Sequence, residues 1–307
     1  MSTQRIVSLL PSATEIVAAL GLADQLVGRS HQCDFPAPVE ALPVLSATKV
    51  NLDGGSRAID RRVNEIIAQD VSVYRVDADL LRALRPDVIL TQTQCAICAV
   101  TPADLEDALR DWMGEEPTLV SLAPDNLGDV WGDVLRVGAA LGVAPRAHAV
   151  VAELKARLEA IAAWNRGDAR PTVAAIEWMD PLMAGGNWMP ELIEIAGGTS
   201  LFATAGQHSP WLDWQALVAA DPEVILLLPC GFRIDQSLAD LPLLALQPGW
   251  AELSAVRRGR VFVIDGHHYF NRPGPRLVES AEMIAEILHP DRFDFGHQGV
   301  GWIRAPV

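Results

Sequence analysis

The chain has few basic residues and no long apolar run. It carries 24 Lys and Arg against 39 Asp and Glu, a formal net charge of −15 over 307 residues. Basic patches drive nucleic-acid binding, so we expect no nucleic-acid partner. No apolar stretch has the length of a membrane span, so we expect no membrane insertion. The sequence also lacks G-x-G-x-x-G, Walker A and G-x-S-x-G patterns, which disfavours the nucleotide-binding and serine-hydrolase classes that depend on them.

Cysteine is scarce, with four residues in the chain. The strand-like segment Ile6–Leu10 begins almost at once after Met1, and no longer apolar stretch of the secretory-signal kind precedes it. We therefore expect a cytoplasmic location. Thiols stay reduced there, so a structural disulfide framework is not expected.

Two distant segments share one pattern of helix, break, short β-branched strand and cysteine. They are Leu80–Cys98 (LLRALRPDVILTQTQCAIC) and Gln215–Cys230 (QALVAADPEVILLLPC). Strands alternate with helices around both, which favours the α/β class with two Rossmann-like lobes and open parallel-type sheets. Such sheets present ligands at the carboxyl ends of their strands, where both segments place a thiol.

The predicted organisation has three parts. Residues 1–125 form an N-terminal α/β lobe, 126–168 a connecting helical segment, and 169–307 a C-terminal α/β lobe with a final helix and an irregular tail from Pro290. The connector is rich in Ala and Leu and amphipathic, which indicates a long rigid helix, with Pro145 as a break or a second start. Ser12–Glu15 reads as a capping box that opens the first helix.

The segment IVSLLPSATE (Ile6–Glu15), the paired strand phrases and the long central helix together resemble the class III substrate-binding proteins. These are the vitamin B12, haem and siderophore binders of ABC importers. The motifs SHQCDFP, TQTQCAICAV, LPCGF and HHYFNRPGPRLVE are similar to those of a leaderless subfamily described as cobalamin-binding. The resemblance implies two lobes joined by a rigid helix. It also implies an interlobe cleft for a large flat metal chelate, a corrinoid above all.

One part of the importer pattern is altered. Importer binding proteins commonly carry a Glu on each lobe, seven positions before the Pro of the strand phrase, which pairs with permease arginines. Here the two positions hold Asp79 and Gln215. We therefore expect the usual docking by two salt bridges to be impaired.

Thiols and imidazoles follow several predicted strands. Soft thiolates with imidazole suit zinc, iron or cobalt, so direct metal ligation is one hypothesis. Packing as small hydrophobes and, for the C-x-x-C pair, redox chemistry are the alternatives. The candidate metal ligands are Cys33, Cys95, Cys98 and Cys230.

Aromatic residues gather in the predicted loops of the second half, and broad aromatic walls suit a flat macrocycle. Arginines at the start of the last helix could hold an anionic group. Asp180 and Asp265 read as turn residues. The candidate ligand contacts are Ser12, His31, Gln94, Glu177, Trp178, Trp188, Trp211, Phe232, His268, Tyr269 and Arg272.

The leading hypothesis is a cytoplasmic binding protein that holds a corrinoid or similar metal chelate between the lobes without turnover. The main alternative is a metal-binding enzyme or metallochaperone that uses the Cys/His residues. A third hypothesis is an ABC importer substrate-binding subunit, which Gln215 disfavours.

Overall fold

The computed structural model describes residues 4–69, 72–93, 100, 105, 116–164 and 169–306. The chain divides into two compact units. The first comprises Met1–Leu52, Arg61–Pro124 and Gly128–Glu153, and the second comprises Asp53–Asp60, Asp125–Leu127 and Leu154–Val307. Each unit has a sheet of its own, which confirms the predicted α/β class.

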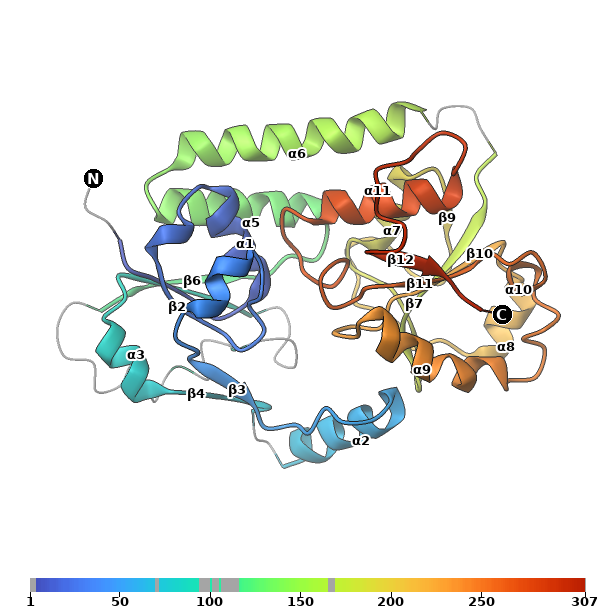
Figure 1. Ribbon diagram of the computed structural model, residues 1–307, viewed down its shortest axis with the longest axis horizontal. Helices are drawn as coiled ribbons and strands as arrows, with labels where there is room; N and C mark the ends of the chain where they lie inside the picture. The colour runs from blue at the N-terminus through green and yellow to red at the C-terminus, as the bar shows by residue number, and fades with distance from the viewer. Residues whose placement is uncertain are drawn as a thin grey trace. The chain divides into compact units, whose positions relative to one another are not determined.

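The first unit is built on a parallel sheet of four strands (Figure 1). In sheet order these are β2 (Leu26–Arg29), β1 (Ile6–Ser8), β5 (Val88–Gln92) and β6 (Thr118–Leu122). β1 and β5 are buried along their whole length, as expected of central strands with helices on both faces. An antiparallel ribbon of β3 (Ser46–Thr48) and β4 (Tyr74–Val76) joins this unit.

Several helices lie wholly or partly in the first unit. They are α1 (Pro11–Ala19), α2 (Ser56–Ile67), α3 (Ala78–Leu84), α5 (Leu127–Ala140) and α6 (Ala144–Trp164), with 3-10 turns at Ala23–Gln25 and Ala37–Ala41. The helix α2 begins in a segment of the second unit, and α6 ends in one. Pro145 stands at the second position of α6, so it starts a new helix, as one of its two predicted roles required. A Cβ on Gly138 would lie 2.3 Å from the Cβ of Ala147, so α5 and α6 approach too closely for any larger residue there.

The second unit has a six-stranded mixed sheet. Its parallel part is β11 (Val261–Ile264), β10 (Val224–Leu227), β7 (Thr172–Met179) and β9 (Thr199–Ser200). Two antiparallel strands extend it, β8 (Leu182–Ala184) beside β7 and β12 (Trp302–Arg304) beside β11.

Each face of this sheet has its own helices. One face packs its Ile and Val side chains against α8 (Trp214–Ala220), α9 (Ile234–Ala245) and α10 (Ser254–Arg257). The other face carries α7 (Met189–Ile195) and α11 (Leu277–Leu288), which lie side by side (Figure 1). Every residue of α11 except Glu279 is buried, so this helix forms the centre of the unit.

The two strand phrases adopt the same local structure. Asp77 caps α3 by accepting the Leu80 N–H at 2.9 Å, and Asp213 caps α8 by accepting the Ala216 N–H at 3.1 Å. Both helices end on a left-handed residue before the central strand of a sheet, at Arg85 (φ 45°) and at the matching position after α8. The duplicated pattern therefore marks one repeated helix-to-strand unit.

Two local predictions are wrong. The helix α1 begins one residue before Ser12 with Pro11, and its N-cap Leu10 makes no side-chain hydrogen bond, so no capping box forms. Pro11 suits the first helical position because an N–H there has no intrahelical partner. The tail is not irregular throughout, because Trp302–Arg304 pairs antiparallel with β11.

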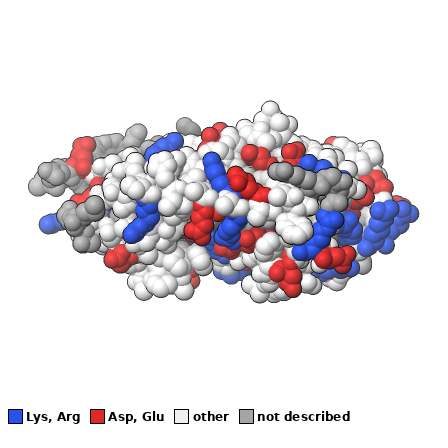
Figure 2. All heavy atoms as spheres, turned by 90° about the horizontal axis from the view of Figure 1, so that it is seen from above, with Lys and Arg blue, Asp and Glu red and all other residues white. Residues whose placement is uncertain are grey.

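No described helix is both long enough and apolar enough to span a bilayer. Acidic and basic side chains are interspersed on the face in Figure 2, most of which is formed by other residues. Basic side chains gather at the right-hand end of that view, the end at which Figure 1 draws α10.

Candidate functional site

The carboxyl end of β7 and the loops that follow β10 and β11 lie together in the second unit. The Cys230 N–H donates to the Glu177 carbonyl at 3.0 Å, and the Gly231 N–H donates to the Gly266 carbonyl at 3.3 Å. Asn271 Nδ2 donates to the same Gly266 carbonyl at 3.0 Å. Cross-bonded loops at this edge of a parallel sheet form a rigid platform at the place where α/β folds bind ligands.

Trp178 and Phe232 form the aromatic part of this platform. Their ring centroids lie 5.2 Å apart at an interplanar angle of 63°, an edge-to-face pair. Phe232 is 4% exposed and supports the indole from below the surface. The Trp178 Nε1 atom is buried and has no hydrogen-bond acceptor among the described residues. A buried donor without an acceptor is uncommon, and an acceptor atom on a bound ligand would satisfy it.

Glu177 is held by a hydroxyl beside the platform. The Ser209 hydroxyl donates to Glu177 Oε2 at 2.8 Å and accepts the Gly186 N–H at 3.0 Å. A Cβ on Gly186 would lie 2.5 Å from the Ser209 backbone nitrogen, so the close approach of these loops requires glycine. The carboxylate is therefore positioned by the fold and not by a chance surface rotamer.

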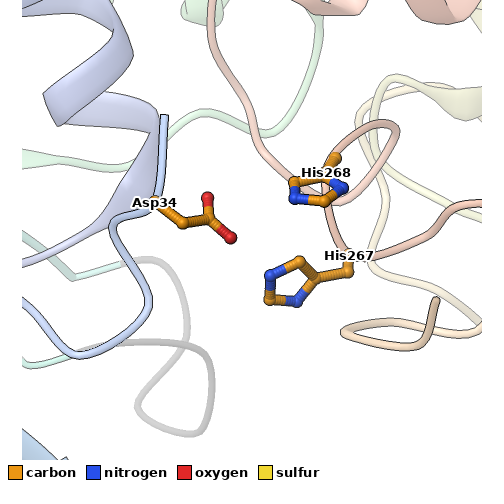
Figure 3. Close-up of side chains that lie close together, drawn as sticks. All are labelled: Asp34, His267 and His268. Atoms are coloured by element: carbon orange, nitrogen blue, oxygen red, sulfur yellow. The ribbon is translucent and has the colours of Figure 1, made fainter. Parts of the chain in front are cut away.

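His267 and His268 follow β11, and their imidazole rings lie next to each other (Figure 3). Asp265 organises both, because its carboxylate accepts the N–H of His267 at 3.0 Å and of His268 at 2.8 Å, and the His268 Nδ1–H at 2.8 Å. Burial alone would raise the pKa of Asp265, but these hydrogen bonds outweigh it and hold the pKa below its ordinary value. The carboxylate fixes the His268 proton on Nδ1, so that in the neutral imidazole Nε2 carries the lone pair.

Arg272 holds the His267 imidazole through Nε2, whereas Asp265 holds the His268 imidazole through Nδ1. Its Nη2 lies 3.1 Å from His267 Nε2, and because guanidinium only donates, Nε2 is the acceptor. Arg272 is 5% exposed, so its charge is held inside the loop. The ring centroids of His267 and His268 are 4.8 Å apart at 80°.

Other predicted contacts on this loop have packing roles. The Arg276 guanidinium carbon lies 4.2 Å from the centre of the Tyr269 ring, a cation–π contact. Burial raises the pKa of Tyr269 above its ordinary value. Trp188 is 8% exposed and donates from Nε1 to the Phe270 carbonyl at 2.7 Å. Trp188 therefore holds the loop in place from within, which is a different role from the predicted ligand contact.

Trp211 is exposed by 64% and pairs as an isolated bridge with Met183 of β8. A pocket of about 220 Å³ is lined nearby by Leu182, Leu212, Trp214 and Leu244. Small-molecule sites usually enclose about 300–1,000 Å³, so this pocket is too small for a macrocycle.

In the first unit, His31 follows β2. Its Nδ1 lies 2.9 Å from Ser46 Oγ, and its Nε2 is buried without a partner among the described residues. Burial and the charge of Arg29 lower the pKa of His31, so the imidazole is neutral at pH 7. A neutral imidazole with an unused buried nitrogen is compatible with the ligand contact predicted for His31.

Cys33 lies in the interior among hydroxyl groups. Thr14 Oγ1 donates to its sulfur at 3.0 Å, and the thiol donates to Ser30 Oγ at 3.4 Å. Its side chain is fully buried, and Ser12 is only 2% exposed. The described surroundings of Cys33 are those of a structural thiol and offer no support for metal ligation. Ser12 likewise lacks an exposed surface for a ligand.

The remaining thiols do not extend the metal hypothesis. Cys230 is half-buried on the platform, and neither it nor Cys33 forms a disulfide. Gln94, Cys95 and Cys98 lie outside the described residues.

Asp265 is the residue that sequence reasoning missed, because Asp-Gly is also an ordinary turn. The available signal was the spacing of Asp265 and His268, three positions apart at a strand end. That spacing lets one carboxylate meet both the backbone and the imidazole of the same turn.

The comparison with known families is decisive about kinship. Residues 6–267 match the family model described as Periplasmic binding protein. The chain belongs to this family. This confirms the class III resemblance noted from the strand phrases.

Relatives of this chain are distant but match nearly its whole length. An uncharacterized ABC transporter substrate-binding lipoprotein of Bacillus subtilis, YvrC, is 24% identical over 94% of this chain and 81% of its own length. The vitamin B12-binding protein of Vibrio cholerae is 25% identical, with 93% and 89% covered. Among solved structures, a periplasmic heme binding protein from Pseudomonas aeruginosa has a TM-score of 0.69 at 23% identity, with 95% and 94% covered. That likeness shows the fold.

The expectation of impaired permease docking is not supported. Asp79 and Gln215 stand at the second positions of the matched helices α3 and α8, and both are exposed. Asp79 also pairs with Arg82 at 3.0 Å. A relative named as an ABC transporter substrate-binding lipoprotein spans almost the whole chain, so the kinship is with transporter components.

Proposed function

We propose that this protein binds a planar metal chelate, a corrinoid or a haem, without catalysing a reaction on it. The observation that carries the proposal is the Asp265–His268 pair at the carboxyl edge of the second sheet. Relatives named as vitamin B12-binding and heme-binding proteins support the same ligand class.

His268 supplies the metal-directed atom in this proposal. Histidines that bind metals through one ring nitrogen usually donate the other N–H to a carboxylate or carbonyl, which fixes the ring and strengthens the ligand. Asp265 does this at 2.8 Å on Nδ1. Nε2 of His268 would then take an axial position on the cobalt or iron of the chelate.

Trp178 and Glu177 supply contacts to the rest of the ligand. The indole offers a flat apolar face and a buried N–H that lacks an acceptor in the described structure. Corrinoids and haems carry amide or carboxylate side groups whose oxygens would accept this N–H. The Glu177 carboxylate, held by Ser209, could accept from amide N–H groups, which favours a corrinoid over a haem.

The test is a spectroscopic titration of the purified protein with aquocobalamin and, separately, with haemin. Imidazole ligation shifts the absorbance of either chelate, so we expect saturable spectral changes in the wild type. His268→Ala should abolish the axial-ligand shift. His148→Ala removes an exposed imidazole from α6 and should leave the titration unchanged.

Absence of a spectral change for both chelates up to high micromolar concentration would end the proposal. Binding that His268→Ala leaves spectrally unaltered would remove the axial role and keep only the binding role. The Cys/His metalloenzyme and metallochaperone alternative predicts metal in freshly purified protein, which elemental analysis detects.

The named relatives also support a role as the substrate-binding component of an importer. This role requires measurable affinity for a permease. The cytoplasmic location remains a prediction from the sequence, and cell fractionation checks it.

A further inference from the structure

Four arginines gather at the edge of the second sheet opposite the ligand loops. Three stand in the run Arg257-Arg258-Gly259-Arg260, and the fourth is Arg304 at the end of β12. We call this set the arginine cluster. The run precedes β11, so it lies at the amino end of that strand, whereas the loops of the proposed chelate site follow the carboxyl end.

Local geometry brings the arginine cluster together. Gly259 adopts φ +61°, a left-handed turn that glycine takes without strain, and so reverses the chain from α10 into β11. A Cβ on Gly259 would lie 3.7 Å from Arg304 Nη1. Arg304 pairs across the sheet with Phe262 and places its guanidinium carbon 5.8 Å from that ring centre.

The charges of the cluster are incompletely neutralised. Arg257, Arg258 and Arg304 are exposed, and Arg260 is half-buried among them. Burial lowers the pKa of Arg260, Glu223 opposes the effect, and the charges of Arg258 and Arg304 add to it.

Two carboxylates face the cluster. Glu223 forms a long ion pair with Arg258, with its carboxylate oxygen 3.8 Å from Nη1. The Asp221 carboxylate is already engaged by Ser254, whose N–H and hydroxyl it accepts at 2.6 and 2.7 Å. Four cations therefore face two carboxylates, in a protein whose net charge is −15.

We propose that the arginine cluster binds a phosphate-bearing ligand with two or more negative charges. Guanidinium groups match phosphate oxygens in bidentate geometry, and a multivalent anion relieves the mutual repulsion that the two carboxylates leave. The phosphate could belong to a soluble polyphosphorylated molecule or to a lipid headgroup. The site is separate from the chelate loops, so it does not depend on the proposed function.

The test is calorimetric titration with tripolyphosphate at low ionic strength. Arg258→Gln and Arg304→Gln should each weaken binding about tenfold, the change expected from one lost charge-assisted hydrogen bond. Both side chains are exposed, so the fold should persist. Arg75→Gln on β4 removes an exposed arginine of the first unit and should leave the affinity unchanged.

Sedimentation with phosphatidylglycerol vesicles identifies the source of the phosphate. Retention that either cluster variant abolishes assigns a lipid headgroup, whereas tripolyphosphate binding without retention assigns a soluble ligand. The proposal is overturned if the wild type binds neither probe at about 1 mM. It is also overturned if Arg75→Gln weakens binding as much as the cluster variants do.

Discussion

Asp133 is a buried carboxyl group on α5 whose ionisation should cost the protein stability at neutral pH. The residue is 1% exposed. Burial raises the pKa of Asp133 to about 6, and the charge of Arg136 and the Ala123 N–H offset the rise only in part. Arg136 Nη1 approaches Oδ1 at 2.5 Å, but its side chain is 54% exposed, so water screens its charge.

The magnitude follows from proton linkage. The carboxyl has an ordinary pKa of 3.8 and a folded-state pKa of about 6, so the folded state binds more protons than the unfolded state between these values. Stability is therefore lost as pH rises from about 4 to about 6 and stays lower above that. The difference of about 2.2 pKa units corresponds to about 3 kcal/mol at pH 7, to order of magnitude.

Asp133→Asn removes this titration while keeping the shape of the side chain. Any fixed cost of the amide is the same at every pH, so it cancels in a comparison across pH. Relative to the wild type, the variant should gain about 2–3 kcal/mol in the free energy of unfolding between pH 4 and pH 8. Urea denaturation at a series of pH values measures this difference.

Asp24→Asn is the matched control, because Asp24 is an exposed carboxyl of the same unit. Its difference from the wild type should stay within about 0.5 kcal/mol over the same range. A flat difference for Asp133→Asn would show that Asp133 is ionised without penalty and would refute the reasoning.

Three further predictions concern other sites. Glu282 raises the pKa of His297 through a 3.1 Å hydrogen bond. The stabilisation of the folded state by this bond is therefore complete below pH 6.5 and is lost as pH rises through the folded-state pKa. In urea denaturation, His297→Gln should cost about 2 kcal/mol at pH 6 and much less at pH 9. Trp178→Phe removes an indole N–H that has no acceptor in the described structure, so thermal stability should hold while aquocobalamin affinity falls about fivefold in the titration; equal affinity would contradict the proposed donor. Cys33→Ala removes a fully buried sulfur while Ser8 Oγ, 2.8 Å from Thr14 Oγ1, still accepts the Thr14 hydroxyl, so the variant should cost only about 1 kcal/mol in urea denaturation, with the metal content by elemental analysis unchanged.

The platform illustrates how much of a binding site a sequence can predict. Trp178 lies near the end of β7 and Phe232 follows β10, two strands that the sequence marks by β-branched runs, and both residues lie at the expected edge. Their edge-to-face pairing depends on the register between β7 and β10, which no local pattern encodes. In the sequence Trp188 looks like Trp178, since both are tryptophans near a predicted strand end or turn of the second half. In the structure, however, Trp188 lies inside the fold and its Nε1 donates to the Phe270 carbonyl in the loop after β11.

Cys33 also shows that the position of a residue after a strand does not determine its role. The placement of Cys33 after β2 was visible in the sequence, and it suggested a metal ligand. Its surroundings come from Thr14 and Ser30, two residues on different elements, and they make the thiol part of an internal hydroxyl network. The role of a polar side chain depends on its neighbours in space, so residue type and strand position are insufficient.

The sequence by itself determined the alternation of strands and helices, the duplicated helix-to-strand unit and hence the α/β class and the family. These features rest on short-range physics, namely Asp N-caps, left-handed helix ends and buried β-branched runs within each segment. Tertiary structure alone decided that β12 pairs with β11, that Asp265 holds His268 and that Arg304 joins the Arg257–Arg260 run. The strand pairing and the arginine cluster join residues distant along the chain, and even the three-residue Asp265–His268 contact depends on how the loop after β11 folds against its neighbours.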